Sequence, residues 1–218
     1  DDLQRVERSP KKYNRESNIR LVRLAMDFSL NEDQVLLRDS ITKYVVNDYP
    51  FAERQRITRE TQGLSPKHWS AFAEFGWLTI QFAEDVGGYG GSIEDTAILM
   101  EVFGTALVLE PYLANVLLAG QLIARSGSGS NIEHQLVPMM EGRRQLALAA
   151  LERQARQNFS EVTTSATANT DGYVLNGTKV LVLNGMAADT LVVSARTAGT
   201  QLERDGISLF AVDAAAAG

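Results

Sequence analysis

Apolar residues recur at helical spacing through roughly the first 140 residues of the chain. The clearest apolar stripe lies at positions i, i+4, i+7 and i+8 and consists of Leu37, Ile41, Tyr44 and Val45. Side chains at this spacing share one face of a helix. Asn31 precedes the stripe and Gln34 lies three residues after Asn31, which is the pattern of a capping box. The pattern therefore predicts an amphipathic helix that begins near Asn31.

Similar signals predict further helices downstream, over residues 52–59, 66–76, 92–103, 111–123 and 132–140. Pro66 and Pro111 suit the first position of a helix, where the missing N–H costs nothing. Ser92 with Asp95 forms a second capping pattern. The apolar residues after Ser92 lie nearly all round the helix, so we expect this helix to be buried centrally.

The period changes from Gln145 onward. Short apolar or threonine-rich runs typical of strands cover residues 146–151, 162–168, 173–175, 179–183, 191–195 and 207–212. Between them lie dipeptides favoured in tight hairpin turns, namely Asp171-Gly172, Asn176-Gly177 and Asp205-Gly206. Helices followed by strands favour an α+β chain. We therefore predict a helical N-terminal domain over 26–142 and an antiparallel, barrel-like β domain over 143–218.

Residues 1–25 differ from the rest of the chain, because they combine seven basic and four acidic residues with little apolar periodicity. They contain no apolar core of the kind that a secretory signal requires. Met26 then opens the first well-patterned segment. We interpret this basic leader as an artefact of expression or of start-site assignment. A transit peptide is the alternative, which the acidic residues disfavour.

Composition and charge exclude several classes of function. The net charge of −6 argues against a nucleic-acid partner, and the absence of cysteine excludes disulfides, thiolate zinc sites and a cysteine nucleophile. No apolar run reaches the roughly 20 residues that span a bilayer. His68 and His134 lie far apart, so no metal site is predicted. The lack of cysteine suits a reducing compartment, and we expect a cytoplasmic location.

Several segments, in order and at matching spacing, resemble the acyl-CoA dehydrogenase family over residues 26–218. They are Met26–Leu30 with Glu32, Gln34 and Arg38; Glu84–Gly91; Glu101–Gly104; and Tyr173–Lys179 with Asn184-Gly185, Ala188-Asp189 and Ala195-Arg196. The resemblance implies a helical domain, a β-barrel-like domain and a C-terminal four-helix bundle, of which this chain would lack the last. It also implies FAD-dependent α,β-dehydrogenation of an acyl-CoA thioester.

In most of that family, a glutamate from the C-terminal bundle removes the α-proton while a hydride leaves for flavin N5. We therefore assign no catalytic residue within this sequence, and we expect the 218-residue chain alone to be inactive. Glu101, Glu110 and Glu152 are interpreted as solvated surface carboxylates, as is usual for this residue type. His68 is interpreted as a helix-surface residue.

The resemblance implies six candidate FAD-binding positions, which are Ala150, Leu151, Glu152, Gln157, Leu181 and Leu183. Several depart from the family pattern. Leu151 replaces the threonine of the usual Thr-Glu pair, 156–158 reads Arg-Gln-Asn in place of Gly-Ser-Asp, and 181–183 replaces an aromatic residue followed by Ile-Thr or Ile-Ser. Leu151 and Leu183 have no hydroxyl, so hydrogen bonds to a flavin would come from backbone N–H groups.

These departures leave alternatives open. FAD binds here through backbone, hydrophobic and partner-chain contacts, or the chain is a non-catalytic partner subunit of a heteromeric dehydrogenase. The sequence is similar to the small-subunit branch of the pimeloyl-CoA or sterol side-chain type. A flavin monooxygenase of the same fold is a third reading, and Leu181 and Leu183 could also be barrel core. The expected partners are an acyl-CoA, an electron-transfer flavoprotein or similar acceptor, and the other chains of a homo- or hetero-tetramer.

Overall fold

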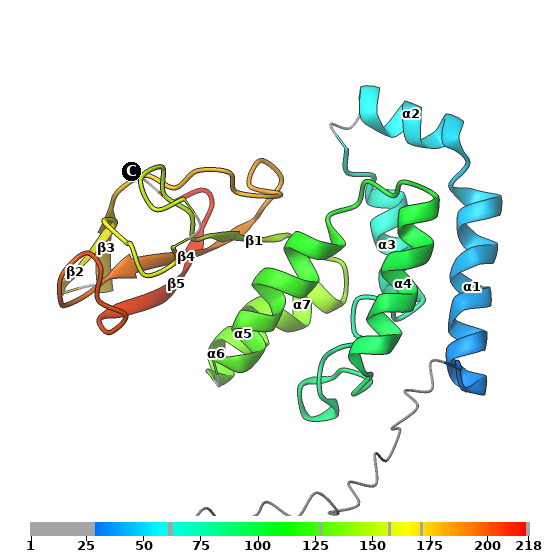
Figure 1. Cartoon of the computed structure of the whole chain (residues 1–218), viewed down its shortest axis with the longest axis horizontal. Coiled ribbons are helices and arrows are strands. Elements are labelled where there is room, and N and C mark those ends of the chain that lie inside the picture. Colours follow the sequence, from blue (N-terminus) through cyan, green and yellow to red (C-terminus); the bar gives the residue numbers. More distant parts are fainter. Residues whose placement is uncertain (1–28, 61–62, 127, 157, 171, 217–218) are drawn as a thin grey trace, which may run out of the picture.

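The computed structural model describes residues 29–60, 63–126, 128–156, 158–170 and 172–216 (Figure 1). The predicted basic leader and the candidate Gln157 lie outside these residues. The helical elements are α1 (Glu32–Asp48), α2 (Phe51–Glu60), α3 (Pro66–Glu74), the 3₁₀ turn η1 (Glu84–Val86), α4 (Ile93–Thr105), the π-helix η2 (Leu113–Gly120), α5 (Gln121–Arg125), α6 (Gly129–Asn131), the π-helix η3 (Ile132–Leu136) and α7 (Val137–Met140). The strands are β1 (Leu146–Ala149), β2 (Ser165–Asn169), β3 (Gly172–Asn176), β4 (Thr190–Arg196) and β5 (Ile207–Asp213).

Local capping signals fix the starts of two long helices. The Asn31 side chain accepts a hydrogen bond from Gln34 N at 2.8 Å, and Asn31 N donates to Gln34 Oε1 at 3.2 Å. Ser92 and Asp95 make the same reciprocal pair at the start of α4. Both predicted capping boxes are therefore confirmed. Ser65 precedes α3 as expected, but its side chain makes no capping hydrogen bond.

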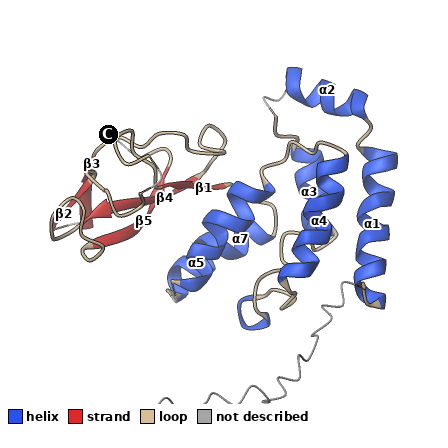
Figure 2. Cartoon of the chain, viewed as in Figure 1, coloured by secondary structure: helices blue, strands red, loops and turns tan. Residues whose placement is uncertain are grey.

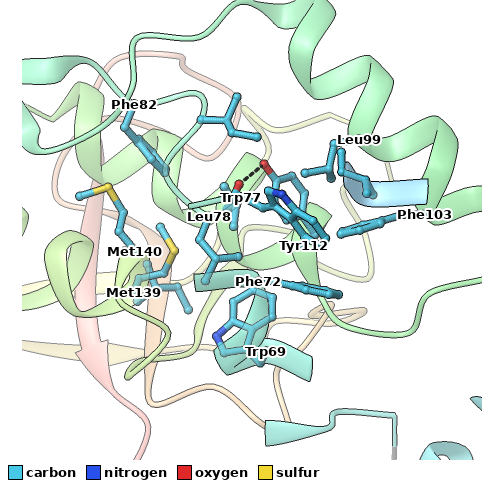
Figure 3. Packing of buried hydrophobic residues seen from close by; sticks show 14 of the residues in the cluster. Trp69, Phe72, Trp77, Leu78, Phe82, Leu99, Phe103, Tyr112, Met139 and Met140 are labelled. Carbon is cyan, nitrogen blue, oxygen red and sulfur yellow. Dashed lines mark hydrogen bonds between the residues drawn. The ribbon is translucent and has the colours of Figure 1, made fainter. Parts of the chain in front are cut away.

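The helical core combines aromatic side chains with leucine and methionine side chains (Figure 3). The rings of Phe72 and Phe103 stack with centroids 4.8 Å apart, and Phe72 is fully buried. The Tyr112 hydroxyl donates to the Trp77 carbonyl at 3.0 Å, so this buried phenol is satisfied. The prediction that α4 is buried centrally is wrong, because one side of the helix is exposed, at Ile93, Ala97, Glu101 and Gly104. One face of α4 packs into this core, and its start faces solvent.

The β domain is a single mixed sheet centred on β4 (Figure 2). β5 pairs antiparallel along the whole of β4, and β2 pairs antiparallel with β3, as the hairpin signals predicted. The expectation of an antiparallel sheet is wrong for β1, which runs parallel to β4 in the register Leu146 to Thr190. β2 also meets β4 in parallel, through Ser165 and Arg196.

Residues 179–183, predicted to be a strand, form an irregular segment followed by a turn. Leu181 has a φ of 52°, in the left-handed region that an extended strand excludes. The segment instead makes a single backbone hydrogen bond to the residues after β1, in which Val180 N donates to the Leu151 carbonyl at 2.9 Å. The residues just after β1 are thereby held against the 179–183 segment.

The described residues also bear on two further sequence predictions. Within them, no helix is both long and apolar enough to cross a bilayer. The same residues contain no group of three or more His, Asp or Glu side chains arranged to hold a metal ion.

Candidate functional site

An apolar cavity of about 470 Å³ lies between the helical region and the β domain. Its helical wall comes from the end of α4, the 107–112 connection and the first residues of η2, including Leu113 and Ala114. Leu183 and Asn184 close it from the β domain. A cavity bordered by two structural units and lined mostly by apolar side chains is a typical small-molecule site.

Leu183 lines this cavity from the β domain, and Leu181 and Met186 lie two and three residues from it along the chain. Their exposed fractions are 81% for Leu181, 55% for Leu183 and 96% for Met186. The reading of Leu181 and Leu183 as barrel core is therefore wrong. Leu181 and Asn184 both have positive φ, at 52° and 62°, and such conformations persist in non-glycine residues where the surroundings impose them. We call Leu181, Leu183 and Met186 the apolar ledge.

An amide network joins the ledge to the helical region. The Asn184 side chain donates to Gln145 Oε1 and to the Leu146 carbonyl, each at 3.2 Å. Asn115 of η2 donates to the same Gln145 oxygen at 2.8 Å and accepts from Leu146 N at 3.0 Å. Asn115 is fully buried. The start of β1, the π-helix and the ledge are therefore held in one arrangement on either side of the cavity.

Glu152 anchors the segment after β1 inside the β domain. Its side chain is almost fully buried, and the Lys179 ammonium pairs with Oε1 at 2.7 Å. The backbone N–H and hydroxyl groups of Thr163 and Thr164 also donate to the carboxylate. Burial alone would raise the pKa of Glu152, but these donors outweigh it and hold the pKa well below the usual range. The surface interpretation of Glu152 is therefore wrong.

Glu110 is a second buried carboxyl, in the helical wall of the cavity. It is 5% exposed, so its surface interpretation is also wrong; Glu101, by contrast, is exposed as expected. Glu110 Oε1 accepts from Ser65 N at 3.3 Å, and Oε2 has no group in hydrogen-bonding geometry among the described residues. Burial raises the pKa of this carboxyl, and hydrogen bonding offsets the rise only in part.

His68 lies behind Glu110 in a buried polar cluster. It is fully buried, which overturns its prediction as a surface residue. One ring nitrogen contacts the Tyr44 hydroxyl at 2.6 Å and the other contacts Glu53 Oε1 at 3.0 Å. Hydrogen bonds from Arg56 and His68 lower the pKa of Glu53 to about 2. Both His68 nitrogens are therefore occupied by partners other than Glu110.

The structure brings several of the candidate residues named from the sequence close to the cavity or to the apolar ledge. Leu183 lines the cavity, Leu181 is exposed on the ledge, and Leu151 is tied to the ledge through Val180. Ala150 accepts a weak hydrogen bond from Ser194 at 3.5 Å beside them. Sequence reasoning missed Glu110, although its position between two apolar runs, 107–109 and 111–114, is a signal of burial.

The fold and site together define a class of protein, with a helical region, a mixed sheet and an apolar cleft between them. Comparison with known families assigns both regions of the chain to the two domains of one family. Residues 31–143 match the acyl-CoA dehydrogenase N-terminal domain, and residues 147–218 match the acyl-CoA dehydrogenase middle domain. The chain belongs to the acyl-CoA dehydrogenase family, a family of flavoprotein oxidoreductases.

Individual relatives agree with this assignment. The chain is 31% identical over 196 residues to a short-chain specific acyl-CoA dehydrogenase of Clostridium acetobutylicum, covering 86% of this chain and 49% of the relative. It is 33% identical over 171 residues to the caffeyl-CoA reductase-Etf complex subunit CarC of Acetobacterium woodii, covering 75% and 45%. The chain thus spans about half the length of the curated relatives that it matches.

A solved structure supports the fold independently. The structure described as the FAD complex of PigA superimposes with a TM-score of 0.75 at 24% identity, covering 86% of this chain and 49% of that one. This likeness concerns the fold, which places a helical region and a mixed sheet in the same arrangement.

Proposed function

We propose that the full-length protein catalyses FAD-dependent α,β-dehydrogenation of an acyl-CoA thioester. The observation that carries the proposal is the apolar cavity between η2 and the ledge, in a chain of this family. An acyl chain would lie in this cavity, where apolar walls exclude water. The expected substrates are fatty acyl-CoA or sterol side-chain acyl-CoA thioesters, which substrate profiling distinguishes.

The residues at the ledge suit a flavin in shape and polarity. Three exposed apolar side chains in the segment that borders the cavity offer a surface for a planar aromatic ring. Ala150, Leu151, Leu181 and Leu183 would hold the flavin through apolar contact and backbone N–H groups, since none carries a side-chain donor. Gln157, outside the described residues, remains a candidate contact.

Glu152 would act on the flavin site through the backbone. Its oxygens are occupied by Lys179, Thr163 and Thr164, so it would fix Leu151 beside the ledge without touching the cofactor. The same donors and its lowered pKa make Glu152 unsuitable as the base that removes the α-proton. FAD, when bound, supplies the hydride acceptor. The protein's part is to orient the thioester and to keep the cleft dry.

A second candidate function is that of a non-catalytic partner subunit in a heteromeric acyl-CoA dehydrogenase. It is favoured by the leucines at 151 and 183, which offer a flavin no side-chain hydrogen bond. In either role we expect a cytoplasmic homo- or hetero-tetramer that passes electrons to an electron-transfer flavoprotein or a similar acceptor. The relative named as an Etf complex subunit supports that choice of acceptor. We place the domain boundary near residues 142–143.

The test is to purify the full-length protein alone and with any sister subunit, and to measure released FAD after denaturation. The first function predicts FAD in the protein alone, whereas the second predicts FAD only in the assembly. FAD in neither preparation, even after reconstitution, would contradict both. Rapid oxygen consumption by the reduced protein would instead indicate the monooxygenase alternative.

A gain-of-function variant sharpens this test. Leu183→Thr restores a hydroxyl at the cavity edge, and one new hydrogen bond should tighten FAD binding about 5- to 10-fold. The matched control is Leu36→Thr, on a 67% exposed position of α1, which should leave FAD affinity unchanged. Equal affinity for all three proteins would argue against a flavin beside Leu183.

A further inference from the structure

The segment that carries the ledge, residues 181–187, has little packing of its own to hold it in place. Leu181 and Met186 are 81% and 96% exposed, so burial does little to fix their positions. The segment belongs to no strand. Its two internal backbone hydrogen bonds, donated by Gly185 N and Ala187 N, end on carbonyls of the same segment. Another contact must therefore hold these residues against the rest of the protein.

The side chain of Asn184 supplies that contact. Its amide group donates to Gln145 Oε1 and to the Leu146 carbonyl, each at 3.2 Å. Among the described residues, these are the only hydrogen bonds that join residues 181–187 to another part of the chain. Asn184 is also the only residue of this segment with a polar side chain. One amide group therefore ties the ledge to the start of β1.

The two acceptors of this amide are themselves fixed on several sides. Gln145 is 9% exposed, and Leu146 is fully buried. Gln145 N donates to Asp189 Oδ2 at 2.7 Å, and the Gln145 carbonyl accepts from Asp189 N at 2.8 Å. Gln145 Oε1 also accepts from the Asn115 side chain at 2.8 Å. Asn184 therefore attaches the exposed ledge to a well-ordered part of the junction between η2 and the sheet.

The backbone of Asn184 also determines the direction of the segment. Its φ of 62° lies in the left-handed region, which asparagine adopts more readily than most residues with a side chain. Asn184 lines the apolar cavity together with Leu183. It also lines a second cavity of about 510 Å³, together with Gly185 and Met186. A change in the conformation of Asn184 would therefore move the walls of both cavities.

We propose that Asn184 is a positioning residue for the flavin, because its side-chain amide holds the ledge in the conformation to which the cofactor binds. The inference rests on the proposed function, since it assumes that the flavin lies against the ledge. The ledge side chains offer a flavin no hydrogen-bond donor, so the fit depends on where the backbone is held. A segment that is already ordered does not have to be ordered on binding, which tightens binding.

The experiment measures the dissociation constant of FAD for the full-length protein, in whatever assembly it forms. Asn184→Gly still accepts the positive φ but lacks the amide, so it tests the two hydrogen bonds apart from the backbone conformation. FAD should bind about 3- to 10-fold more weakly to this variant. Asn184→Asp keeps the size of the side chain but brings a carboxylate oxygen against two acceptors. Its FAD affinity should fall by about 10-fold or more.

Hydrogen exchange of the protein freed of FAD measures the position of the ledge directly. The amides of Gly185 and Ala187 should exchange faster in both variants, while those of α4 keep the wild-type rate. A residue that only stabilised the fold would lower the free energy of unfolding without changing the FAD affinity of the folded protein. Asn47→Asp makes the same chemical change on an exposed position of α1. This matched control should keep the wild-type FAD affinity and ledge exchange.

The outcomes distinguish failure of this inference from failure of the proposed function. If the folded Asn184→Gly and Asn184→Asp proteins bind FAD as tightly as wild type, the inference is overturned and the proposed function stands. Faster exchange at the ledge with unchanged FAD affinity would overturn it too, because the flavin would then not depend on the ledge. If wild type binds no FAD, alone or with any sister subunit, the inference and the proposed function both fail.

Discussion

The two buried carboxyl groups, Glu110 in the helical region and Glu152 in the β domain, lie in opposite kinds of surroundings. Glu152 accepts from Lys179, Thr163 and Thr164, and its pKa is lowered. Glu110 accepts from one backbone N–H, and its pKa is raised. The difference teaches that burial alone says little about role. A carboxylate with many donors stays ionised when it is buried, whereas a carboxyl with few donors keeps the raised pKa that burial imposes.

The largest effect should come from removing the partner of the saturated carboxylate. Lys179→Met leaves Glu152 charged and almost fully buried, and breaking a buried ion pair on one side costs about 3–5 kcal/mol. The free energy of unfolding, measured by urea denaturation, should fall by that amount. The matched control is Lys43→Met on the exposed face of α1, which should change it by less than about 0.5 kcal/mol. A small effect of Lys179→Met would mean that the pair is open to solvent.

A smaller loss of stability is expected when the hydrogen-bond network between η2 and the start of β1 is broken. Asn115→Ala removes the acceptor of the Leu146 N–H and one of the two donors to Gln145 Oε1, which keeps the Asn184 amide as its other donor. Unpaired buried groups of this kind cost about 1–3 kcal/mol. Hydrogen exchange should increase at β1 and at the ledge while α1 and α4 remain protected. Equal loosening of all elements would contradict a joint confined to these residues.

The smallest effects are two pH dependences of opposite sign. The lowered pKa of Glu152 contributes stability that is present above its unfolded pKa, near 4.3, and lost as pH falls. The raised pKa of Glu110 contributes stability at low pH that is lost as pH rises through its folded pKa. Glu110→Gln should therefore gain about 1 kcal/mol relative to wild type at pH 8, and should gain nothing at pH 4.

The measurement is urea denaturation at a series of pH values for wild type, Glu110→Gln and Glu152→Gln. For Glu152→Gln the free energy of unfolding should fall less steeply as the pH is lowered, because the carboxylate that must be protonated is gone. Parallel pH profiles for all three proteins would show that neither carboxyl has a shifted pKa.

Local signals in the sequence predicted most of the helices and hairpins. Asn31 with Gln34 and Ser92 with Asp95 form the expected caps because both partners are three residues apart. The parallel pairing of β1 with β4 joins residues 44 positions apart, such as Leu146 and Thr190, and no local pattern encodes it. The 179–183 segment has the composition of a strand, but the positive φ of Leu181 interrupts it.

The candidate site was predicted only in part, for the same reason. The family resemblance drew attention to Leu151 and Leu183, and both lie beside the ledge or the cavity. The burial of Glu110 and Glu152 was missed because their partners lie far away in the chain: Ser65 is 45 residues from Glu110, and Lys179 is 27 residues from Glu152. A carboxylate looks solvated until such partners are known.

The most direct test of the central claim is to add a saturated acyl-CoA, without oxygen, to the full-length protein that has been reconstituted with FAD, alone and with any sister subunit. The account predicts loss of the visible absorbance of the oxidised flavin and formation of the 2-enoyl-CoA in equal amount. Bound FAD that stays oxidised at saturating acyl-CoA in both preparations would contradict it.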